Sequence, residues 1–344
     1  MTNLITGIVY DPIFLQHDFH GHPENSARLK SIITTLKEKG LLQELAQVKS
    51  RQADFNEIRL CHTKEYIQYV KSFCEKGGGY LDPDTYSTKY SFLAAATAVG
   101  SSIDLTKNVI NGKLKNGFAL LRPPGHHALS NRAMGFCLFG NIAIAAKFAL
   151  TQTGINKIAI VDFDVHHGNG TQALVGDDPN ILFISSHQYP FYPGTGSINE
   201  IGSGDAEGTI LNIPLQAGVG DEGLKIVYEE VVIPSLERFK PDLILISAGY
   251  DAHWKDPLAN LDLSLVGFNW ISKQLINFAK NICGGKIIFF LEGGYDLDVL
   301  SYGVTNTIRR LLGIDEFEDP IGKSNQNEPD IKKLIKELIK IHNL

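Results

Sequence analysis

The amino-acid sequence predicts an α/β fold of three layers (α/β/α), in which helices cover both faces of one mainly parallel central sheet. Short apolar runs recur along the chain, and each is followed by polar residues and then by a helical pattern. This alternation is typical of parallel sheets. With 344 residues, 43% of them hydrophobic and 20% charged, the chain can bury a large core. The five clearest runs are residues 118–121, 158–161, 181–184, 243–246 and 287–290.

The N-terminal part adds further elements before the first of these runs. Gly40 is placed to end a helix, and Asp54 with Glu57 has the spacing of a capping box at the start of a short helix. In chain order, we expect a strand over 5–10, helices near 29–36, 64–76 and 92–110, and a turn-rich loop over 81–85.

Three histidines, His17, His20 and His22, lie in the loop over 11–24. Three histidines close in sequence invite a metal interpretation. No strand end fixes them together, however, and a metal site needs ligands on a rigid support. We therefore favour a structural or substrate-rim loop.

The C-terminal region differs from the rest in composition. We expect one catalytic domain over 1–314, and an acidic linker with a short amphipathic helix over 315–344. The apolar residues of this helix fall on one face, so we expect it to pack on the domain or on a second subunit of a homo-oligomer. Those residues are Ile331, Leu334, Ile335 and Leu338.

Charge and composition exclude several classes of protein. The net charge of −6 argues against a general nucleic-acid-binding surface. No apolar stretch is long enough to span a membrane. The N-terminus lacks the basic segment of a signal peptide, and Asp11-Pro12 interrupts its apolar run. The four cysteines form no Cys-x-x-Cys pair, so we expect reduced thiols and a cytoplasmic protein.

A pattern of carboxylates and histidine follows the run at 158–161. Side chains alternate in an extended chain, so Asp162, Asp164 and His166 face one side. Two carboxylates beside an imidazole at a buried strand end are costly unless a cation pairs with them, and a divalent metal is the simplest such cation. Asp251 follows a later run and completes a three-ligand set with an open position, as in catalytic zinc sites. The same ligand types suit Fe(II) or Co(II).

Parallel strands deliver their carboxyl ends to one edge of the sheet, where ligands bind. We therefore expect a single rim to receive polar side chains from five strands. These are His126, His127, Asp164, His166, His187, Asp251 and Tyr295.

The adjacent histidines His126 and His127 can supply an acid and a base at this rim. We expect them to have different partners: Asp162 would hold one ring in its charged form, and Asn169 would hold the other as neutral. Such a separation of pKa values assigns acid and base roles. Tyr295 follows two glycines and can donate its hydroxyl to a developing oxyanion, although a buried core tyrosine is the alternative.

Taken together, these motifs resemble the histone deacetylase family, within the arginase–deacetylase fold. Asn169 and the Glu-Gly-Gly-Tyr sequence resemble the class II branch, which includes bacterial histone deacetylase-like amidohydrolases. The resemblance implies a zinc-dependent hydrolase that removes acetyl groups from amines. The matching segments are residues 122–127, 162–172, 192–196, 247–251 and 292–295.

The resemblance also implies roles for single residues in the reaction. Asp164, His166 and Asp251 resemble the zinc ligands. His127 resembles the general base and His126 its electrostatic partner. Tyr295 resembles the residue that stabilises the transition state.

Further residues match the substrate tunnel and a second ion site. Gly135, Phe136 and Tyr192 match the acyl-lysine tunnel. Asp84 matches an acidic rim residue that grips the substrate backbone, with Asp82 as the alternative. The family also carries a structural potassium ion, held mostly through backbone oxygens, and the matching residues here are Asp162, Asp164, His166, Ser185 and Ser186.

The substrate class depends on the residue at the tunnel mouth. Relatives that select acetylated polyamines place a glutamate there, where this chain has Leu258. We therefore expect acetyl-lysine of proteins or peptides rather than an acetylpolyamine. Two other functions stay open: a two-metal hydrolase of the ureohydrolase type, which needs a second carboxylate-rich motif, and a non-catalytic acyl-lysine binding protein.

Overall fold

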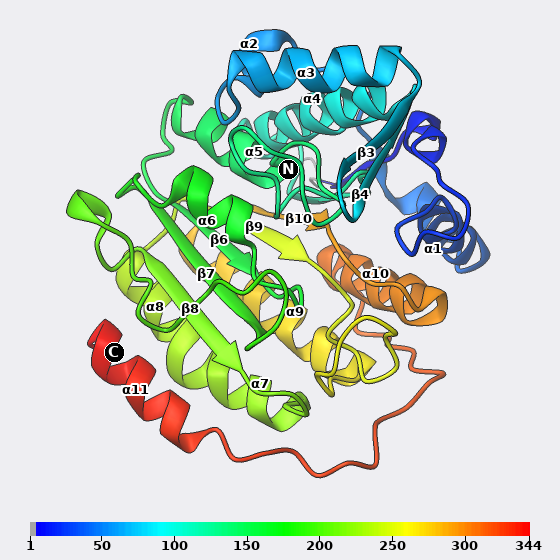
Figure 1. Cartoon of the computed structure of the whole chain (residues 1–344). Coiled ribbons are helices and arrows are strands. Elements are labelled where there is room, and N and C mark those ends of the chain that lie inside the picture. The colour runs from blue at the N-terminus through cyan, green and yellow to red at the C-terminus, as the bar shows by residue number, and fades with distance from the viewer. Residues whose placement is uncertain (1–4) are drawn as a thin grey trace.

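The computed structural model describes residues 5–344. The first four residues lie outside the described residues, and they belong to the N-terminal segment in which we expected no signal peptide. One parallel sheet lies between two layers of helices (Figure 1), so the predicted fold class is confirmed. In spatial order, the sheet consists of β2 (Ala46–Gln47), β1 (Thr6–Val9), β5 (Asn116–Ala119), β10 (Ile287–Leu291), β9 (Leu243–Ala248), β6 (Ile158–Asp162), β7 (Ile181–Gln188) and β8 (Ile210–Leu215).

Helices cover both faces of this sheet (Figure 1). One layer contains α1 (Ala27–Glu38), α10 (Leu297–Leu312), α9 (Leu265–Ile282) and α7 (Asp221–Val227), which contact one another in this order. The opposite layer contains α4 (Ser91–Ile110), α5 (Asn141–Leu150) and α6 (Asn169–Val175). The remaining helices are η1 (Pro12–Gln16), η2 (Leu42–Glu44), α2 (Phe55–Ile58), α3 (Lys64–Glu75), η3 (Gly204–Ala206), the π-helix η4 (Tyr228–Val232), α8 (Ile233–Phe239) and α11 (Lys332–His342).

The central strands form the core because they are buried on both faces. Every residue of β6, β9 and β10 is buried, and each strand is rich in Ile, Leu or Phe, as parallel strands covered by helices require. The register pairs Asp162 with Ser185 of β7 and with Ser247 of β9. The carboxyl ends of these strands therefore lie side by side, and the loops that leave them share one edge.

Several predicted elements differ from the observed ones at their ends. β5 begins at Asn116, two residues before the apolar run, and the adjacent prolines Pro123 and Pro124 have no N–H to extend its ladder. The capping box of Asp54 and Glu57 is present. β7 continues through Gln188, so residues expected to follow this strand belong to it.

Three strand regions were not predicted: the two-residue edge strand β2, the edge strand β8, and the hairpin of β3 and β4. β8 has Asn212 and Pro214 among its apolar residues, and a proline is tolerated there because β8 is an edge strand. β3 (Gly78–Asp82) and β4 (Thr85–Thr88) form a hairpin where we expected a helix end and a loop. Gly78 and Gly79 have positive φ angles, which hid the strand pattern.

The segment after α10 runs along the domain and contacts it repeatedly. The carboxylate of Glu328 accepts hydrogen bonds from the backbone N–H groups of Gly220, Glu222 and Gly223 at the start of α7. The indole of Trp254 donates to the carbonyl of Gly322 at 2.9 Å. α11 then lies against η4, with Ile335 and Leu338 buried. The domain boundary at 314 and any contact of α11 with a second subunit stay predictions.

Within residues 5–344, no helix is long and apolar enough to cross a membrane. The cysteines Cys61, Cys74, Cys137 and Cys283 are free and buried. The reduced state of these thiols and the cytoplasmic location stay predictions.

Candidate active site

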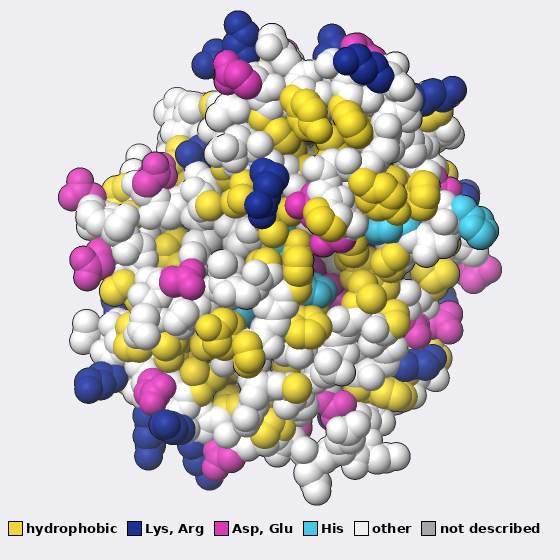
Figure 2. Space-filling model, in the orientation of Figure 1, with side chains coloured by type: hydrophobic (Ala, Val, Ile, Leu, Met, Phe, Trp, Pro, Cys, Tyr) yellow, Lys and Arg dark blue, Asp and Glu magenta, His cyan; other side chains and the backbone are white. Residues whose placement is uncertain are grey.

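A cavity of about 220 Å³ opens at the edge where the strands deliver their carboxyl ends. Figure 2 shows a hollow near the middle of this face, with hydrophobic side chains around it and histidine visible inside. Most side chains that line the cavity are aromatic or apolar, and a few can carry charge, which is the usual composition of a small-molecule site. The lining residues are Asp84, Pro124, His126, His127, Gly135, Phe136, His166, Phe191, Tyr192, Leu258, Gly293 and Tyr295.

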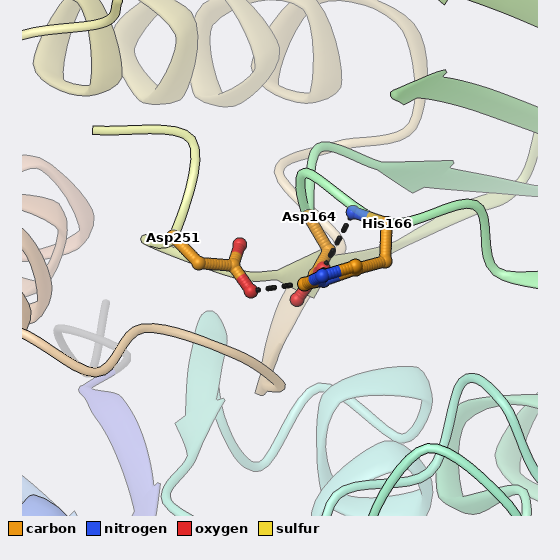
Figure 3. Close-up of side chains that lie close together, drawn as sticks. All are labelled: Asp164, His166 and Asp251. Atoms are coloured by element: carbon orange, nitrogen blue, oxygen red, sulfur yellow. Dashed lines mark hydrogen bonds and ion pairs between the residues drawn. The ribbon is translucent and has the colours of Figure 1, made fainter. Parts of the chain in front are cut away.

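Asp164, His166 and Asp251 meet beside this cavity (Figure 3). One ligand atom from each lies within 4.8 Å of the other two. His166 Nδ1 is 3.1 Å from Asp164 Oδ1 and 3.3 Å from Asp251 Oδ2. Both carboxylates are fully buried, whereas the imidazole side chain is 12% exposed. Among the described residues, no other group of three such side chains comes together in this way.

The donor set fits a divalent cation. Asp251 Oδ2 is buried and makes no hydrogen bond of good geometry, so one carboxylate oxygen is left to a ligand. Burial opposes a charged ring, but the adjacent carboxylates of Asp164 and Asp251 raise the pKa of His166 to about 10. A metal binds only the neutral imidazole. A metal cation and the extra proton of His166 therefore compete for the same ring nitrogen.

Two glycines let the carboxylates approach the backbone closely. A Cβ atom on Gly249 would lie 2.1 Å from Asp164 Oδ2, and one on Gly293 would lie 2.0 Å from Asp251 Oδ2. The N–H of Gly293 donates to Asp164 Oδ2 at 2.8 Å, and the N–H of Val165 donates to Asp251 Oδ1 at 3.0 Å. These bonds fix the orientation of both carboxylates.

The two adjacent histidines have the different partners that we expected. His126 Nδ1 lies 3.0 Å from Asp162 Oδ2, and His127 Nδ1 lies 2.7 Å from Asn169 Oδ1. Burial disfavours both imidazolium forms. At His126 the charges of Asp164 and Asp162 outweigh burial and raise the pKa well above its ordinary value. At His127 burial and the neighbouring cationic rings lower the pKa well below it.

Glu292 holds the loop that carries these histidines, and sequence reasoning gave it no role. Its carboxylate accepts hydrogen bonds from the N–H groups of Gly125, at 2.7 Å, and His126, at 3.2 Å. Burial raises the pKa of Glu292 to about 7. An acidic residue directly after the buried run of β10 is the signal that could have revealed it.

Tyr295 lies at the cavity, where its ring meets the edge of Phe136 at 5.9 Å. The guanidinium of Arg28 lies 5.1 Å from the centre of the Tyr295 ring. Burial raises the pKa of Tyr295 well above its ordinary value, and the charge of Arg28 only partly opposes this. The hydroxyl therefore keeps its proton at neutral pH and can donate a hydrogen bond.

Aromatic side chains form the walls of the cavity. Phe136 has a positive φ of 68°, which is rare for a bulky residue and points to a functional constraint. Tyr192 meets the ring of His127 edge-on at 5.3 Å. Phe191 stacks on His166 at 5.6 Å, and sequence reasoning missed it because Tyr192 is the residue that matches the motif. Leu258 lines the cavity as well.

Asp84 lies between β3 and β4 and borders the cavity. Its Oδ1 accepts hydrogen bonds from Gly135 N–H, at 3.1 Å, and from the hydroxyl of Thr85, at 2.8 Å. Asp82 does not line the cavity; burial and the charge of Asp84 raise its pKa. Of the two carboxylates, Asp84 therefore has the better position at the rim.

The histidines of the N-terminal loop do not converge on one point. His17 is buried and lies 2.6 Å from Ser91 Oγ, whereas His20 is exposed. His22 packs against Phe136 at 4.7 Å and lies 3.1 Å from the carbonyl oxygen of Asp84. This loop therefore supports the hairpin and the cavity wall rather than a metal.

One expected rim residue lies elsewhere. His187 belongs to β7, is fully buried, and contacts Ser185 Oγ and the carbonyl of Gly196 at 2.9 Å each. The prediction that it reaches the rim was wrong because β7 extends past it. Ser185 and Ser186 are buried beside Asp162 in the sheet, and the potassium site expected there stays a proposal.

The chain is similar to proteins of one family over nearly its whole length. The family model "Histone deacetylase domain" matches residues 22–311. The chain is 41% identical to "Histone deacetylase 14, chloroplastic" of Arabidopsis thaliana, over 95% of this chain and 82% of that protein. It is 38% identical to a "Probable deacetylase" of Archaeoglobus fulgidus, over 91% of this chain and 88% of the other.

A solved structure agrees with these matches. The crystal structure of the HDA15 HD domain superposes with a TM-score of 0.90 and 36% sequence identity, over 98% of this chain and 94% of that domain. The range that the family model matches, residues 22–311, includes the buried Asp-His-Asp group. The protein therefore belongs to the histone deacetylase family of hydrolases, with the arginase–deacetylase fold.

Proposed function

We propose that the protein is a zinc-dependent deacetylase that hydrolyses the amide of acetylated lysine side chains in proteins or peptides. The observation that carries this proposal is the meeting of Asp164, His166 and Asp251 beside a narrow cavity that also contains His127 and Tyr295. A zinc ion held by these three ligands would polarise the acetyl carbonyl and acidify a water molecule. Fe(II) suits the same ligands.

His127 is suited to act as the general base. Its Nδ1 faces the amide oxygen of Asn169, so Nδ1 carries the proton of the neutral ring and Nε2 is free to accept one. The lowered pKa keeps the ring neutral near pH 7. His127 would take a proton from the attacking water and return it to the leaving amine.

His126 and Tyr295 supply the charge and the hydrogen bond that the reaction needs. His126 stays protonated because Asp162 and Asp164 lie beside it, and its positive charge stabilises negative charge that develops in the cavity. The Tyr295 hydroxyl keeps its proton and would donate to the oxyanion. Neither group has to change its protonation state before the substrate arrives.

The walls of the cavity favour an acyl-lysine chain. Phe136 and Tyr192 offer apolar surface to the methylene groups, and Asp84 would accept an N–H of the substrate backbone at the rim. Leu258 leaves this part of the wall without a carboxylate that could bind a second ammonium group. Acetyl-lysine is therefore the proposed substrate, and an acetylpolyamine is the alternative.

Two further parts of the proposal concern ions and compartment. A potassium ion bound near Asp162, Ser185 and Ser186 would lower the cost of burying two carboxylates. The four free, buried cysteines favour a reducing compartment, and we propose the cytoplasm.

A fluorogenic acetyl-lysine peptide tests the proposal. Purified protein should release acetate, lose this activity after chelation, and regain it with stoichiometric zinc. Parallel reactions with acetylated diamines distinguish the polyamine alternative. Binding of the acetylated peptide without hydrolysis, at full zinc loading, would instead identify a non-catalytic acyl-lysine binding protein.

A further inference from the structure

A buried carboxylate outside the metal ligands holds two different parts of the cavity. Asp256 lies in the loop after β9 and is 6% exposed. Its Oδ1 accepts a hydrogen bond from Leu258 N–H at 2.9 Å, and its Oδ2 accepts one from Tyr295 N–H at 2.7 Å. A longer contact of 3.4 Å joins Oδ2 to Asp296 N–H. One side chain thus binds the backbone of a wall residue and that of the tyrosine.

The peptide bond before Tyr295 is held at both of its polar atoms. Its N–H donates to Asp256, and its carbonyl, which belongs to Gly294, accepts from Arg28 Nε at 2.8 Å. Gly294 has a φ of 114°, a conformation that other residues rarely adopt, and without a Cβ atom it restricts its own backbone less than other residues do. The two contacts supply the rigidity that this glycine lacks.

We propose that Asp256 is a positioning residue that fixes the Tyr295 hydroxyl and the Leu258 wall relative to each other. The inference rests on the proposed deacetylase function. Asp256 does not line the cavity and does not touch the reacting atoms, so it acts through Tyr295. Since misplacement of a catalytic group by about 1 Å can cost a hundredfold in rate, the expected effect of losing this contact is on kcat.

Asp256→Asn tests the proposal. Leu258 N–H and Tyr295 N–H face different oxygens of Asp256, and in asparagine an NH2 donor replaces one of these oxygens, so at least one of the two contacts is lost. We expect kcat on the acetyl-lysine peptide to fall about tenfold to a hundredfold, with KM changed less than about threefold. The matched control is Asp221→Asn, which alters a carboxylate that accepts from Ser264 N–H at 2.9 Å, away from the cavity. It should change kcat less than about twofold.

A double-mutant cycle separates positioning from general damage. In the Tyr295→Phe background, Asp256→Asn should lower kcat by less than about threefold, because residues that act as a unit are not additive. An equal fall in both backgrounds, or none in either, would overturn the proposal. Should the asparagine variant not fold, Asp256→Ser, which stays polar but lacks the carboxylate that reaches both amides, takes its place with the same expectations.

Hydrogen–deuterium exchange provides a readout that does not need activity. The amides of the peptide that contains Tyr295 and Asp296 should exchange at least about tenfold faster in Asp256→Asn than in the wild-type protein. Their exchange rate should be unchanged in Asp221→Asn. Identical rates in all three proteins would contradict the proposal even if the enzyme is active. If wild-type protein deacetylates nothing, the proposed function fails, while faster exchange would still support the role of Asp256 in holding Tyr295.

Discussion

The floor and the walls of the cavity are held by different kinds of structure. Asp164, His166 and Asp251 directly follow β6 and β9, adjacent strands at the centre of the sheet, and backbone N–H groups fix both carboxylates. Tyr192 and Leu258, in contrast, lie on loops, and Tyr192 is 37% exposed. The floor is therefore held as rigidly as a metal site requires, whereas the wall residues lie on loops, where exchanges of side chains leave the sheet undisturbed.

Removal of a floor ligand should have the largest effect. Asp251→Ala should reduce deacetylation to background and abolish stoichiometric zinc binding, because only two ligands remain. Metal analysis and the peptide assay measure both. Asp205→Ala, which removes an exposed carboxylate, is the control and should bind and turn over normally. Full zinc binding by Asp251→Ala would show that metal binding does not depend on the floor of the cavity as described.

Tyr295→Phe should have the next largest effect. Loss of one hydrogen-bond donor to the oxyanion should lower kcat by about 10²–10³-fold, while the amount of bound zinc stays the same. Steady-state kinetics and metal analysis on one preparation test this. A variant that keeps wild-type kcat would show that the tyrosine is only part of the wall.

Asn169→Asp should shift the pH dependence of the reaction. A carboxylate beside Nδ1 favours imidazolium, so the pKa of His127 rises, and opposite charges at this distance raise it by about one unit or more. Because the base must be neutral, the acid limb of the kcat/KM profile should move to higher pH. Asn199→Asp places the same charge on an exposed loop and should leave the profile unchanged.

Leu258→Glu should have the smallest effect on acetyl-lysine and a clear effect on selectivity. The added carboxylate can pair with the free ammonium group of an acetylated diamine, so activity on this substrate should rise. Such a pair at a partly exposed site is worth about 1 kcal/mol or less, roughly fivefold. Leu258→Met keeps the wall apolar and is the control. Equal activity on diamines in both variants would show that the wall does not select by charge.

The floor was predictable because its residues follow apolar runs whose strands must be neighbours. Asp162 is the last residue of β6, Asp164 and His166 follow within four residues, and Asp251 follows β9 by three residues. Their meeting depends only on the parallel sheet. The sequence predicted that Asp162 and Asn169 would hold different rings of the histidine pair, without assigning the rings, and the structure shows that Asn169 contacts His127.

The walls were less predictable because loops lack a periodic pattern. Phe191 has no signal that separates it from Tyr192, and the hairpin that carries Asp84 was read as a loop. The contact between Asp256 and the Tyr295 backbone joins residues 39 positions apart, which no local pattern reveals. His187 shows the converse error, because a polar residue after an apolar run can still be part of the strand.

Gly249 and Gly293 limit how proteins built in this way can diversify. Even a methyl group at either position would overlap a carboxylate oxygen, at 2.1 and 2.0 Å, so no neutral mutational step is open there. New acyl preferences are therefore expected to arise by single amino-acid substitutions in the loops that form the cavity wall. A directed-evolution library for new substrates should accordingly randomise Tyr192 and Leu258 and leave both glycines untouched.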